Sequence, residues 1–593
     1  MAASLCTVIL LFAGSPALAK AYLSVGVLKD PKNFNPFHAT DTGTKKVIGL
    51  IYQPLYRLDS DKMTLIPWLA EDQPIHDSKR KTITFRLRKM QWDDGTECSA
   101  EDVVFTARVF KKFQVPRHYA YWKFIQKIEA LDERTVRLTI WKPMPILYTR
   151  TLTSWIVQKK KWESLISKAD KKLNEILRTE VARGKTRDKA YKAALEGALR
   201  VIQTHAVTNP TGLGPFRFKE RKRGAHILLL KNDRFFGRGK TIAGRKLGPH
   251  IDRVIFKIFD TLGTATLALK KGDIDFLWKG VSNGLVKDLL RDPYIRVPMA
   301  FDSGYRYLAF NLRRAPMSDT SFRRALAYLV DKDFIIERIL HRHGERLDTF
   351  IPPGNTFFHN SHTPTYGEGM DRRKRIEKAY GILSTSGYRW ERPPVDAEGE
   401  IQKGRGLIMP NGKAVPLLTI LTPSADYDTE MATSGLLIRS WLDKLGVPVQ
   451  WKPMAFGAVL QKLRNQRDFD MFILGWRSFS GDPDYLRRFF HSSYDRPNKR
   501  NYSGYRNSEF DRMADLQAKT MDLKLRQRIV MDLQHQLMKD LPYIPLFVPH
   551  RMEGVRTDRF VGWTHWAGGV GNIWSFCLLR PTQWWNRPHP LHK

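Results

Sequence analysis

The stretch Asp468–Phe490 constrains the fold most, because it changes from strand to loop within a few residues. Residues 469–474 form a short apolar run that predicts a buried strand. The following residues are loop formers and large aromatic side chains: Gly475, Trp476, Phe479, Gly481, Asp482, Pro483 and Tyr485. Open α/β sheets bind ligands outside the carboxyl ends of their strands. We therefore expect this stretch to form one wall of a ligand cleft.

The N-terminus has the features of an export signal. Residues 1–19 contain no charged side chain, have an apolar core from Leu5 to Ala13, and end in the small-x-small sequence Ala17-Leu18-Ala19. We expect cleavage before Lys20, with an uncleaved signal-anchor as the alternative. No later stretch reaches 18 consecutive apolar residues, so the mature chain is expected to be soluble.

The composition is that of a globular but strongly basic protein. Hydrophobic residues make up 42% of the 593 residues, which is enough for two or three domain cores. The 99 Lys and Arg against 60 Asp and Glu give a net charge of +39. The basic residues are scattered in pairs and triplets without a nucleic-acid-binding motif, so no nucleic-acid partner is expected. The charge could attract anionic ligands or anionic membranes, but a basic solvated surface is the simplest interpretation.

Only two cysteines, Cys98 and Cys577, follow the predicted signal. They could form one disulfide in an oxidising compartment, or remain two buried thiols.

Local patterns predict several elements of the first half. Alternation or apolar runs predict strands at 22–28 and 82–87 and a helix over 47–56. Ser99 followed by Asp102 predicts a helix start that resembles a capping box. Residues 159–200 contain 13 Lys or Arg against 6 Asp or Glu, with apolar residues at helical spacing. We expect an inserted pair of surface helices there, either solvated or serving as a docking element.

Six motifs in order along the chain resemble the extracellular solute-binding proteins of family 5, the dipeptide-, oligopeptide- and nickel-binding proteins of ABC importers. The motifs are Leu69-Ala70-Glu71, Trp92-x-Asp94-Gly95 with Ala100–Phe105, Thr211–Phe218, Ala268–Asp275, Tyr307–Asn311 with Arg323–Lys332, and Asp470–Tyr485. The insertion at 159–200 departs from the family pattern.

The resemblance implies an α/β, periplasmic-binding-protein-like fold of type II, from the large cluster with an extra subdomain. Two lobes would close by a hinge around a ligand. The expected divisions are a signal at 1–19, lobe I at 20–305, lobe II at 306–545 and a C-terminal return to lobe I at 546–593. The extra subdomain would span about 66–205. Strands would cross between the lobes near 306–311 and 542–550, where prolines interrupt the apolar run of the second segment.

The same resemblance implies a function and its partners. The chain is expected to be a monomeric periplasmic protein that captures peptides or another small solute and delivers it to ABC permease subunits in the inner membrane. No cofactor is expected. The alternative is a basic secreted interaction protein, or a hydrolase with an unrecognised site.

The candidate ligand-binding residues lie mainly beside the predicted cleft wall: Trp476, Arg477, Phe479, Asp482, Asn33, Phe34 and Asn35, with weaker support for Trp563–Trp566. In peptide-binding relatives the third residue after the Gly-Trp pair is an aspartate that pairs with the ligand's α-ammonium. That position is Phe479 here, so only a register shift would let Asp482 serve. Trp476 and Phe479 could stack on a ligand and Arg477 could attract an acidic one. Alternatively the two aromatic residues pack the lobe and Arg477 is solvated.

We find no catalytic motif in the sequence. A Gly-x-Ser-x-Gly elbow and a phosphate-binding loop are both absent. His341, His343 and Glu345 are close enough in sequence to raise the possibility of a metal site, but they fall in an expected loop, so no metal is predicted.

Overall fold

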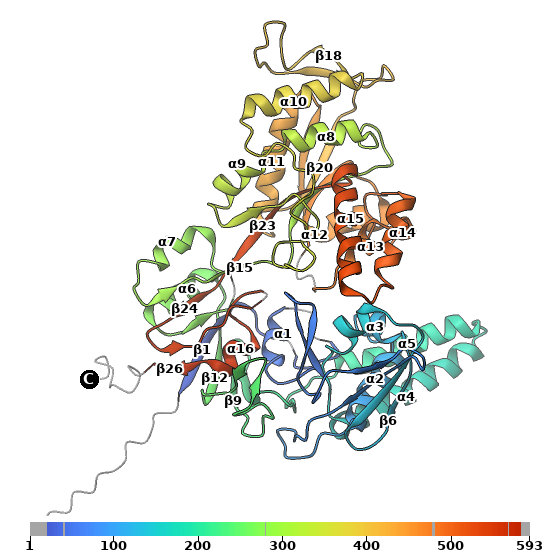
Figure 1. The fold of residues 1–593 in the computed structure, drawn as a ribbon, viewed down its shortest axis with the longest axis vertical. Helices are drawn as coiled ribbons and strands as arrows, with labels where there is room; N and C mark the ends of the chain where they lie inside the picture. The colour runs from blue at the N-terminus through green and yellow to red at the C-terminus, as the bar shows by residue number, and fades with distance from the viewer. Residues whose placement is uncertain are drawn as a thin grey trace, which may run out of the picture.

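The computed structural model describes residues 21–31, 33–38, 42–278, 280–476, 481–566 and 568–582. The chain forms two lobes, one above the other in Figure 1, each built around a seven-stranded mixed sheet. We call the lower one lobe I and the upper one lobe II. A four-stranded sheet and two long helices form an extra subdomain beside lobe I. The predicted signal at 1–19 lies outside the described residues.

The sheet of lobe I has the strand order β14-β24-β13-β1-β12-β9-β8. Its strands are β1 (Tyr22–Val27), β8 (Phe216–Lys222), β9 (His226–Lys231), β12 (Arg253–Ile258), β13 (Phe276–Leu277), β14 (Ile295–Arg296) and β24 (Gly554–Arg556). Strand β1 runs parallel to β12 and β13, and it confirms the strand predicted at 22–28. Ile227 and Leu229 of β9 and Val254 and Phe256 of β12 are fully buried, because alternate side chains face the core.

Short helices and ribbons complete lobe I. They are α1 (Thr42–Ile48), α6 (Leu262–Lys271), η2 (Asn283–Leu285), α7 (Val286–Leu289), α16 (Ile573–Leu578), the ribbon β10 (Thr241–Ile242) with β11 (Arg245–Lys246), and the ribbon β25 (Phe560–Val561) with β26 (Arg580–Pro581). Cys577 on α16 and Cys98 are both buried free thiols, so the disulfide alternative is wrong.

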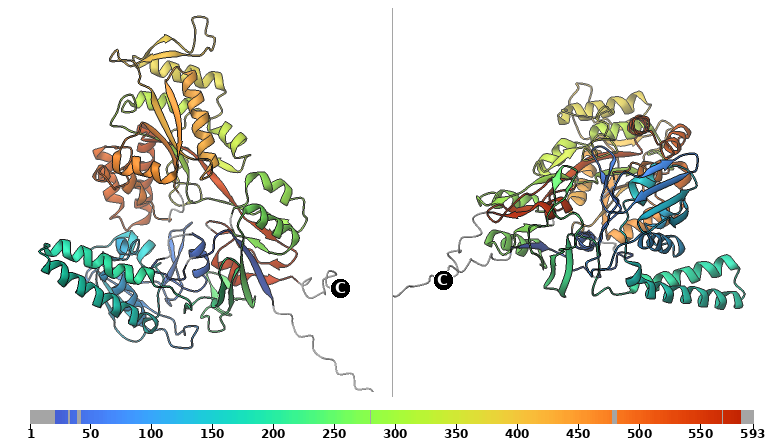
Figure 2. Two further views of the ribbon diagram at one scale, coloured as in Figure 1. Left: turned by 180° about the vertical axis from the view of Figure 1, so that it is seen from behind. Right: turned by 60° about the horizontal axis from the view of Figure 1, so that its bottom comes forward.

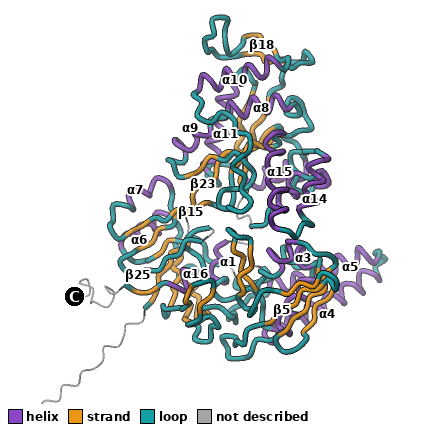
Figure 3. Tube along the Cα trace, viewed as in Figure 1, coloured by secondary structure: helices purple, strands orange, loops and turns teal. Residues whose placement is uncertain are grey.

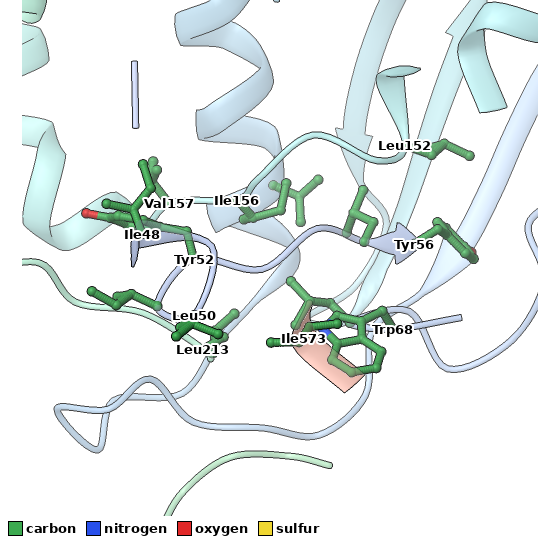
Figure 4. Close-up of a cluster of buried hydrophobic side chains, with 14 of the residues drawn as sticks. Ile48, Leu50, Tyr52, Tyr56, Trp68, Leu152, Ile156, Val157, Leu213 and Ile573 are labelled. Atoms are coloured by element: carbon green, nitrogen blue, oxygen red, sulfur yellow. The ribbon is translucent and has the colours of Figure 1, made fainter. Parts of the chain in front are cut away.

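The helix predicted over 47–56 is wrong, because α1 ends at Ile48 and the chain then turns. The backbone N–H of Gly214 donates to the carbonyl of Ile51 (2.8 Å), and Pro54 cannot continue a helix. The apolar residues of this segment are buried in tertiary contacts instead. They belong to the cluster in Figure 4, where Ile48, Leu50, Tyr52, Tyr56, Trp68, Leu152, Ile156, Val157, Leu213 and Ile573 lie together.

The extra subdomain is built on a sheet of order β4-β5-β7-β6. Its elements are β4 (Ile75–Asp77), β5 (Thr82–Arg86), α2 (Ala100–Lys112), α3 (Tyr119–Trp122), β6 (Ile125–Ala130), β7 (Thr135–Ile140) and the π-helical turn η1 (Leu147–Thr151). The predicted strand at 82–87 and the helix start at Ser99 are both confirmed. The carboxylate of Asp102 accepts a hydrogen bond from the backbone N–H of Ser99 (3.0 Å), as a capping box requires. A ribbon of β2 (Tyr56–Asp59) and β3 (Thr64–Pro67) rises toward lobe II.

The insertion forms a helical hairpin of α4 (Lys159–Ala182) and α5 (Arg187–Thr204), which confirms the predicted pair of helices. Figure 2 shows it projecting from the extra subdomain. Its base is packed into the core, since Trp162 is 4% exposed and its ring meets that of Phe37 edge-on at 4.9 Å.

The sheet of lobe II has the order β15-β23-β16-β22-β20-β21, with β17 also paired to β23. Its strands are β15 (Met299–Phe301), β16 (Arg306–Phe310), β17 (Gly344–Arg346), β20 (Leu418–Pro423), β21 (Val449–Met454), β22 (Met471–Gly475) and β23 (Tyr543–Met552). Strand β22 is the predicted buried strand, and Phe472 and Ile473 are fully buried in it.

Figure 3 shows helices on the faces of this sheet. They are α8 (Thr320–Leu329), α9 (Lys332–Phe334), η3 (Ile335–Ile339), α10 (Arg372–Thr385), α11 (Thr429–Lys444), α12 (Phe456–Gln461), η4 (Lys462–Gln466), α13 (Tyr485–Phe490), η5 (Ser492–Tyr494), α14 (Ser508–Gln517) and α15 (Leu523–Asp540). A ribbon of β18 (Arg389–Arg392) and β19 (Arg405–Ile408) lies at the outer end of the lobe.

The two lobes are connected by the strand pair β15–β23, in which Phe301 pairs with His550 and Met299 with Met552. The return crossing predicted near 542–550 is therefore part of β23, which leads directly into β24 of lobe I. The outward crossing lies earlier than expected. Residues 306–310 are strand β16, which is enclosed between β22 and β23 within lobe II, and β15 makes the crossing. The remaining domain boundaries stay a prediction.

Candidate functional site

The loop after β22 meets the extra subdomain, and Asp482 is the centre of this contact. The Asp482 carboxylate is 3% exposed and forms a bidentate ion pair with Arg526 of α15 (3.1 and 3.0 Å). It also accepts hydrogen bonds from the hydroxyl of Thr149 (2.8 Å) and the backbone N–H of Asp484 (2.9 Å). Although burial opposes ionisation, the Arg526 guanidinium and these donors lower the pKa of Asp482 to about 2. Asp482 is therefore a buried anion that links three segments.

One of those segments belongs to the extra subdomain, which lies across the predicted ligand cleft from lobe II. Thr149 lies on η1 of the extra subdomain, whereas Asp482 and Arg526 belong to lobe II. Met63, from the β2–β3 ribbon, is 5% exposed and packs within the hydrophobic core of lobe II. Gly481 lies against the same ribbon, because a Cβ at this position would be 3.2 Å from Leu58 and 3.4 Å from Met63. The two sides are thus in direct contact at this edge, as in a closed cleft.

Trp476, at the end of β22, is half-buried in an aromatic cluster. Its ring stacks on Phe489 (centroids 3.9 Å apart) and lies nearly parallel to Tyr307 (5.7 Å). The guanidinium of Arg500 lies 6.0 Å from the Trp476 ring centroid and 5.9 Å from that of Phe489. These contacts agree with the alternative that Trp476 packs the lobe. Arg477 and Phe479 lie outside the described residues, and their roles stay predictions.

A pocket of about 230 Å³ lies between the extra subdomain and lobe II. Lys123, Phe124, Met144 and Ile146 line it from the extra subdomain, and Asp484, Arg487, Arg488, Tyr494 and Arg526 from lobe II. A small solute held there would contact both sides of the cleft at once. Arg488 also lies over the ring of Tyr121 from the extra subdomain, 5.7 Å from its centroid.

The structure places the Asn33–Asn35 segment at another location. The side-chain amide of Asn33 donates to the carbonyl of His205 (2.8 Å), and that of Asn35 donates to the carbonyl of Ile202 (2.7 Å). Phe34 is 2% exposed and packs on Phe218 (4.9 Å). The segment thereby fixes the end of α5 to lobe I. Its role in ligand binding, like that of Asp482, stays a prediction.

The weaker candidates are also placed apart from the pocket. Trp563 packs against Phe276 (5.0 Å) and Trp566 against Trp574 (5.5 Å), both within lobe I. The histidine-rich loop continues into β17, where Glu345 lies 3.1 Å from His550 Nε2. Within the described ranges, no three His, Cys, Asp or Glu side chains gather as metal ligands.

Sequence reasoning missed most of the residues that join the two sides. Thr149 and Asp482 are 333 positions apart, and nothing in the sequence marks them as a pair. The basic residues Arg487 and Arg488 could have been noticed, because they directly follow the Asp-Pro-Asp turn of the predicted cleft wall.

A two-lobed α/β structure with a paired-strand crossing and a pocket lined from both sides is typical of the class of solute-binding proteins. A family model, that of bacterial extracellular solute-binding proteins, family 5, matches residues 64–498. The chain belongs to this family, whose members are binding components of ABC importers that take up peptides or nickel. The resemblance noted in the sequence and the predicted fold class are thereby confirmed.

Several proteins of known sequence or structure match this chain over most of its length. The chain is 24% identical over 534 residues to the oligopeptide-binding protein AppA of Bacillus subtilis, covering 89% of this chain and 86% of that one. It is 25% identical over 547 residues to a probable D,D-dipeptide-binding periplasmic protein, DdpA, of Escherichia coli, covering 90% and 89%. A crystal structure of a periplasmic oligopeptide-binding protein of an ABC transporter from Thermotoga maritima superposes with a TM-score of 0.71 at 22% identity, covering 95% and 99%.

Proposed function

We propose that this protein captures a peptide or peptide-like solute in the periplasm and delivers it to an ABC permease in the inner membrane. The observation that carries the proposal is the pocket of about 230 Å³ lined from both sides of the cleft. A solute held in such a pocket favours the closed form, because only that form offers both sets of contacts. The names of the relatives AppA and DdpA favour peptide chemistry.

Peptides suit a cleft of this kind for a general reason. Backbone hydrogen bonds hold the main chain of an extended peptide, while separate pockets accept its side chains. In this proposal the protein binds without chemical conversion and acts as a monomer.

Thermal unfolding of the mature chain with pools of di- to pentapeptides tests the proposal. A ligand that binds only the folded form stabilises it by about 2.7 kcal/mol at a concentration 100 times its Kd, so a binding pool raises Tm. The peptides are then recovered and analysed by mass spectrometry. A rise in Tm with intact peptides supports capture, whereas cleaved peptides would indicate a hydrolase. No rise with any pool would contradict the peptide assignment.

A further inference from the structure

We infer that the pocket between the extra subdomain and lobe II binds an oxyanion group, a carboxylate or a phosphate, carried by the ligand. The inference rests on the proposed function, since the ligand is the solute that this cleft encloses. Its basis is an excess of cationic side chains that come from both sides of the cleft and converge on one small volume.

The lining of the pocket contains four cationic side chains, Lys123, Arg487, Arg488 and Arg526, and one carboxylate, Asp484. Arg526 is neutralised by Asp482 behind it. Asp484 is shared, because Arg487 donates to both of its oxygens (2.8 and 3.1 Å) and Arg488 Nε lies 3.3 Å from one of them. Arg487 also lies 4.0 Å from the half-exposed carboxylate of Asp515. The two arginines therefore share two carboxylates, whereas Lys123 has no carboxylate partner among the described residues.

The excess of positive charge extends from the pocket toward Trp476. Arg500 lies against the Trp476 and Phe489 rings. Burial there, together with the positive charges of Arg488 and Arg464, lowers the pKa of Arg500. Among the described residues, no carboxylate lies within 4.0 Å of Lys123, Arg464 or Arg500. Neighbouring like charges repel one another, and an anion bound between them offsets this repulsion.

The chemistry of the side chains favours an oxyanion over other anions. Guanidinium groups present paired N–H donors that match the geometry of carboxylate and phosphate oxygens. A volume of about 230 Å³ accommodates such a group, but it is smaller than the pockets of about 300–1,000 Å³ that enclose whole drug-sized ligands. The pocket is thus a subsite for one end or one side chain of the solute.

The position of the subsite also links it to closure of the cleft. Lys123 comes from the extra subdomain, whereas Arg487 and Arg488 come from α13 of lobe II. An oxyanion between them pairs with both sides and draws them together. An acidic ligand should therefore favour the closed form more than its neutral analogue does.

The test uses inorganic phosphate and glutarate as separate probes. Each probe is titrated into the protein at constant ionic strength, and the Tm of the protein is measured at each concentration. We expect at least one of them to stabilise the wild-type protein in a saturable way. Arg488→Gln and Lys123→Gln should each weaken that binding about tenfold, the loss expected for one charge-assisted hydrogen bond. Arg512→Gln is the matched control. It removes the same charge from α14, where Arg512 is exposed and pairs with Glu509.

The outcomes separate this inference from the proposed function. Saturable binding of phosphate alone or of glutarate alone identifies which oxyanion the pocket takes. Absence of saturable binding, or equal losses in all three variants, overturns the inference. If neither probe binds in a saturable way but neutral peptides do, the proposed peptide capture stands without the anion subsite. If oxyanions bind and no peptide does, the subsite stands and the peptide assignment fails.

Discussion

Replacement of Thr149 by valine tests whether the contact at Asp482 holds the cleft closed. The Thr149 hydroxyl donates to the buried Asp482 carboxylate across the two sides of the cleft (2.8 Å). Valine keeps the shape and removes the donor. A hydrogen bond to a charged group contributes about 1.5–3 kcal/mol. In the open form water can replace Thr149, while the Arg526 ion pair lies entirely within lobe II and persists. We therefore take the lower end of this range, which corresponds to a factor of about ten in the ratio of closed to open molecules.

Small-angle X-ray scattering of the ligand-free protein measures this ratio through the radius of gyration. We expect Thr149→Val to increase the radius of gyration, whereas Thr149→Ser, which keeps the hydroxyl, should scatter like the wild type. Tm of the valine variant should change little, because the bond joins two folded parts. A valine variant with wild-type scattering and a lowered Tm would refute the argument, since the bond would then stabilise the fold and not closure.

Three further predictions concern stability and reactivity. The pKa of Asp482 is about 2 in the folded protein, below the ordinary value of 3.8 for an aspartate. Its ion pair therefore stabilises the fold fully above about pH 4 and loses this effect as the pH falls toward 2. The difference in Tm between wild type and Asp482→Asn should accordingly narrow from pH 5 to pH 2.5, and a difference independent of pH would contradict this. Gly212→Ala should lower the free energy of unfolding, measured in urea, by about 1–3 kcal/mol. The alanine Cβ would lie 2.1 Å from the carbonyl oxygen of Ile51, so the backbone would have to shift. Gly381→Ala, in open space within α10, should instead stabilise the fold by about 0.5–1 kcal/mol, and equal effects of the two would be inconsistent with this packing. Burial raises the pKa of the Cys577 thiol to about 12. A thiol reagent such as DTNB should therefore label Cys577 in the native protein only as fast as the fold opens. Rapid labelling of Cys577 would contradict its burial.

The sequence predicts those parts of the structure that depend on neighbours in the chain. The strand at 82–86 and the helix that begins after Ser99 follow from alternation and from a capping pair three residues apart. The segment 47–56 was predicted to be helical because burial from several directions gives the same apolar pattern as a buried helix. In this segment the hydrogen bond from the backbone N–H of Gly214 to the Ile51 carbonyl holds the chain in a non-helical conformation.

The candidate site depends on contacts that no local pattern encodes. The cleft wall after β22 could be predicted, since a strand followed by a glycine- and aromatic-rich loop is typical of ligand-binding edges. The role of Asp482 could not be predicted from the sequence, because its partners Thr149 and Arg526 come close to it only in the folded protein. The same holds for the charge excess near Arg488, which resembles any other basic pair in a chain of net charge +39.

The helical hairpin α4–α5 has a mechanical consequence. Its base is anchored through Trp162 and through the amide of Asn35, so it moves with the lobe I side as a rigid arm. Helix α4 has 24 residues and a length of about 36 Å at 1.5 Å per residue. A rotation of about 10° between the lobes would therefore move the tip near Gly184 up to about 6 Å further than the base of the hairpin. A fluorophore at this exposed turn would therefore act as a pointer that magnifies the opening and closing of the cleft.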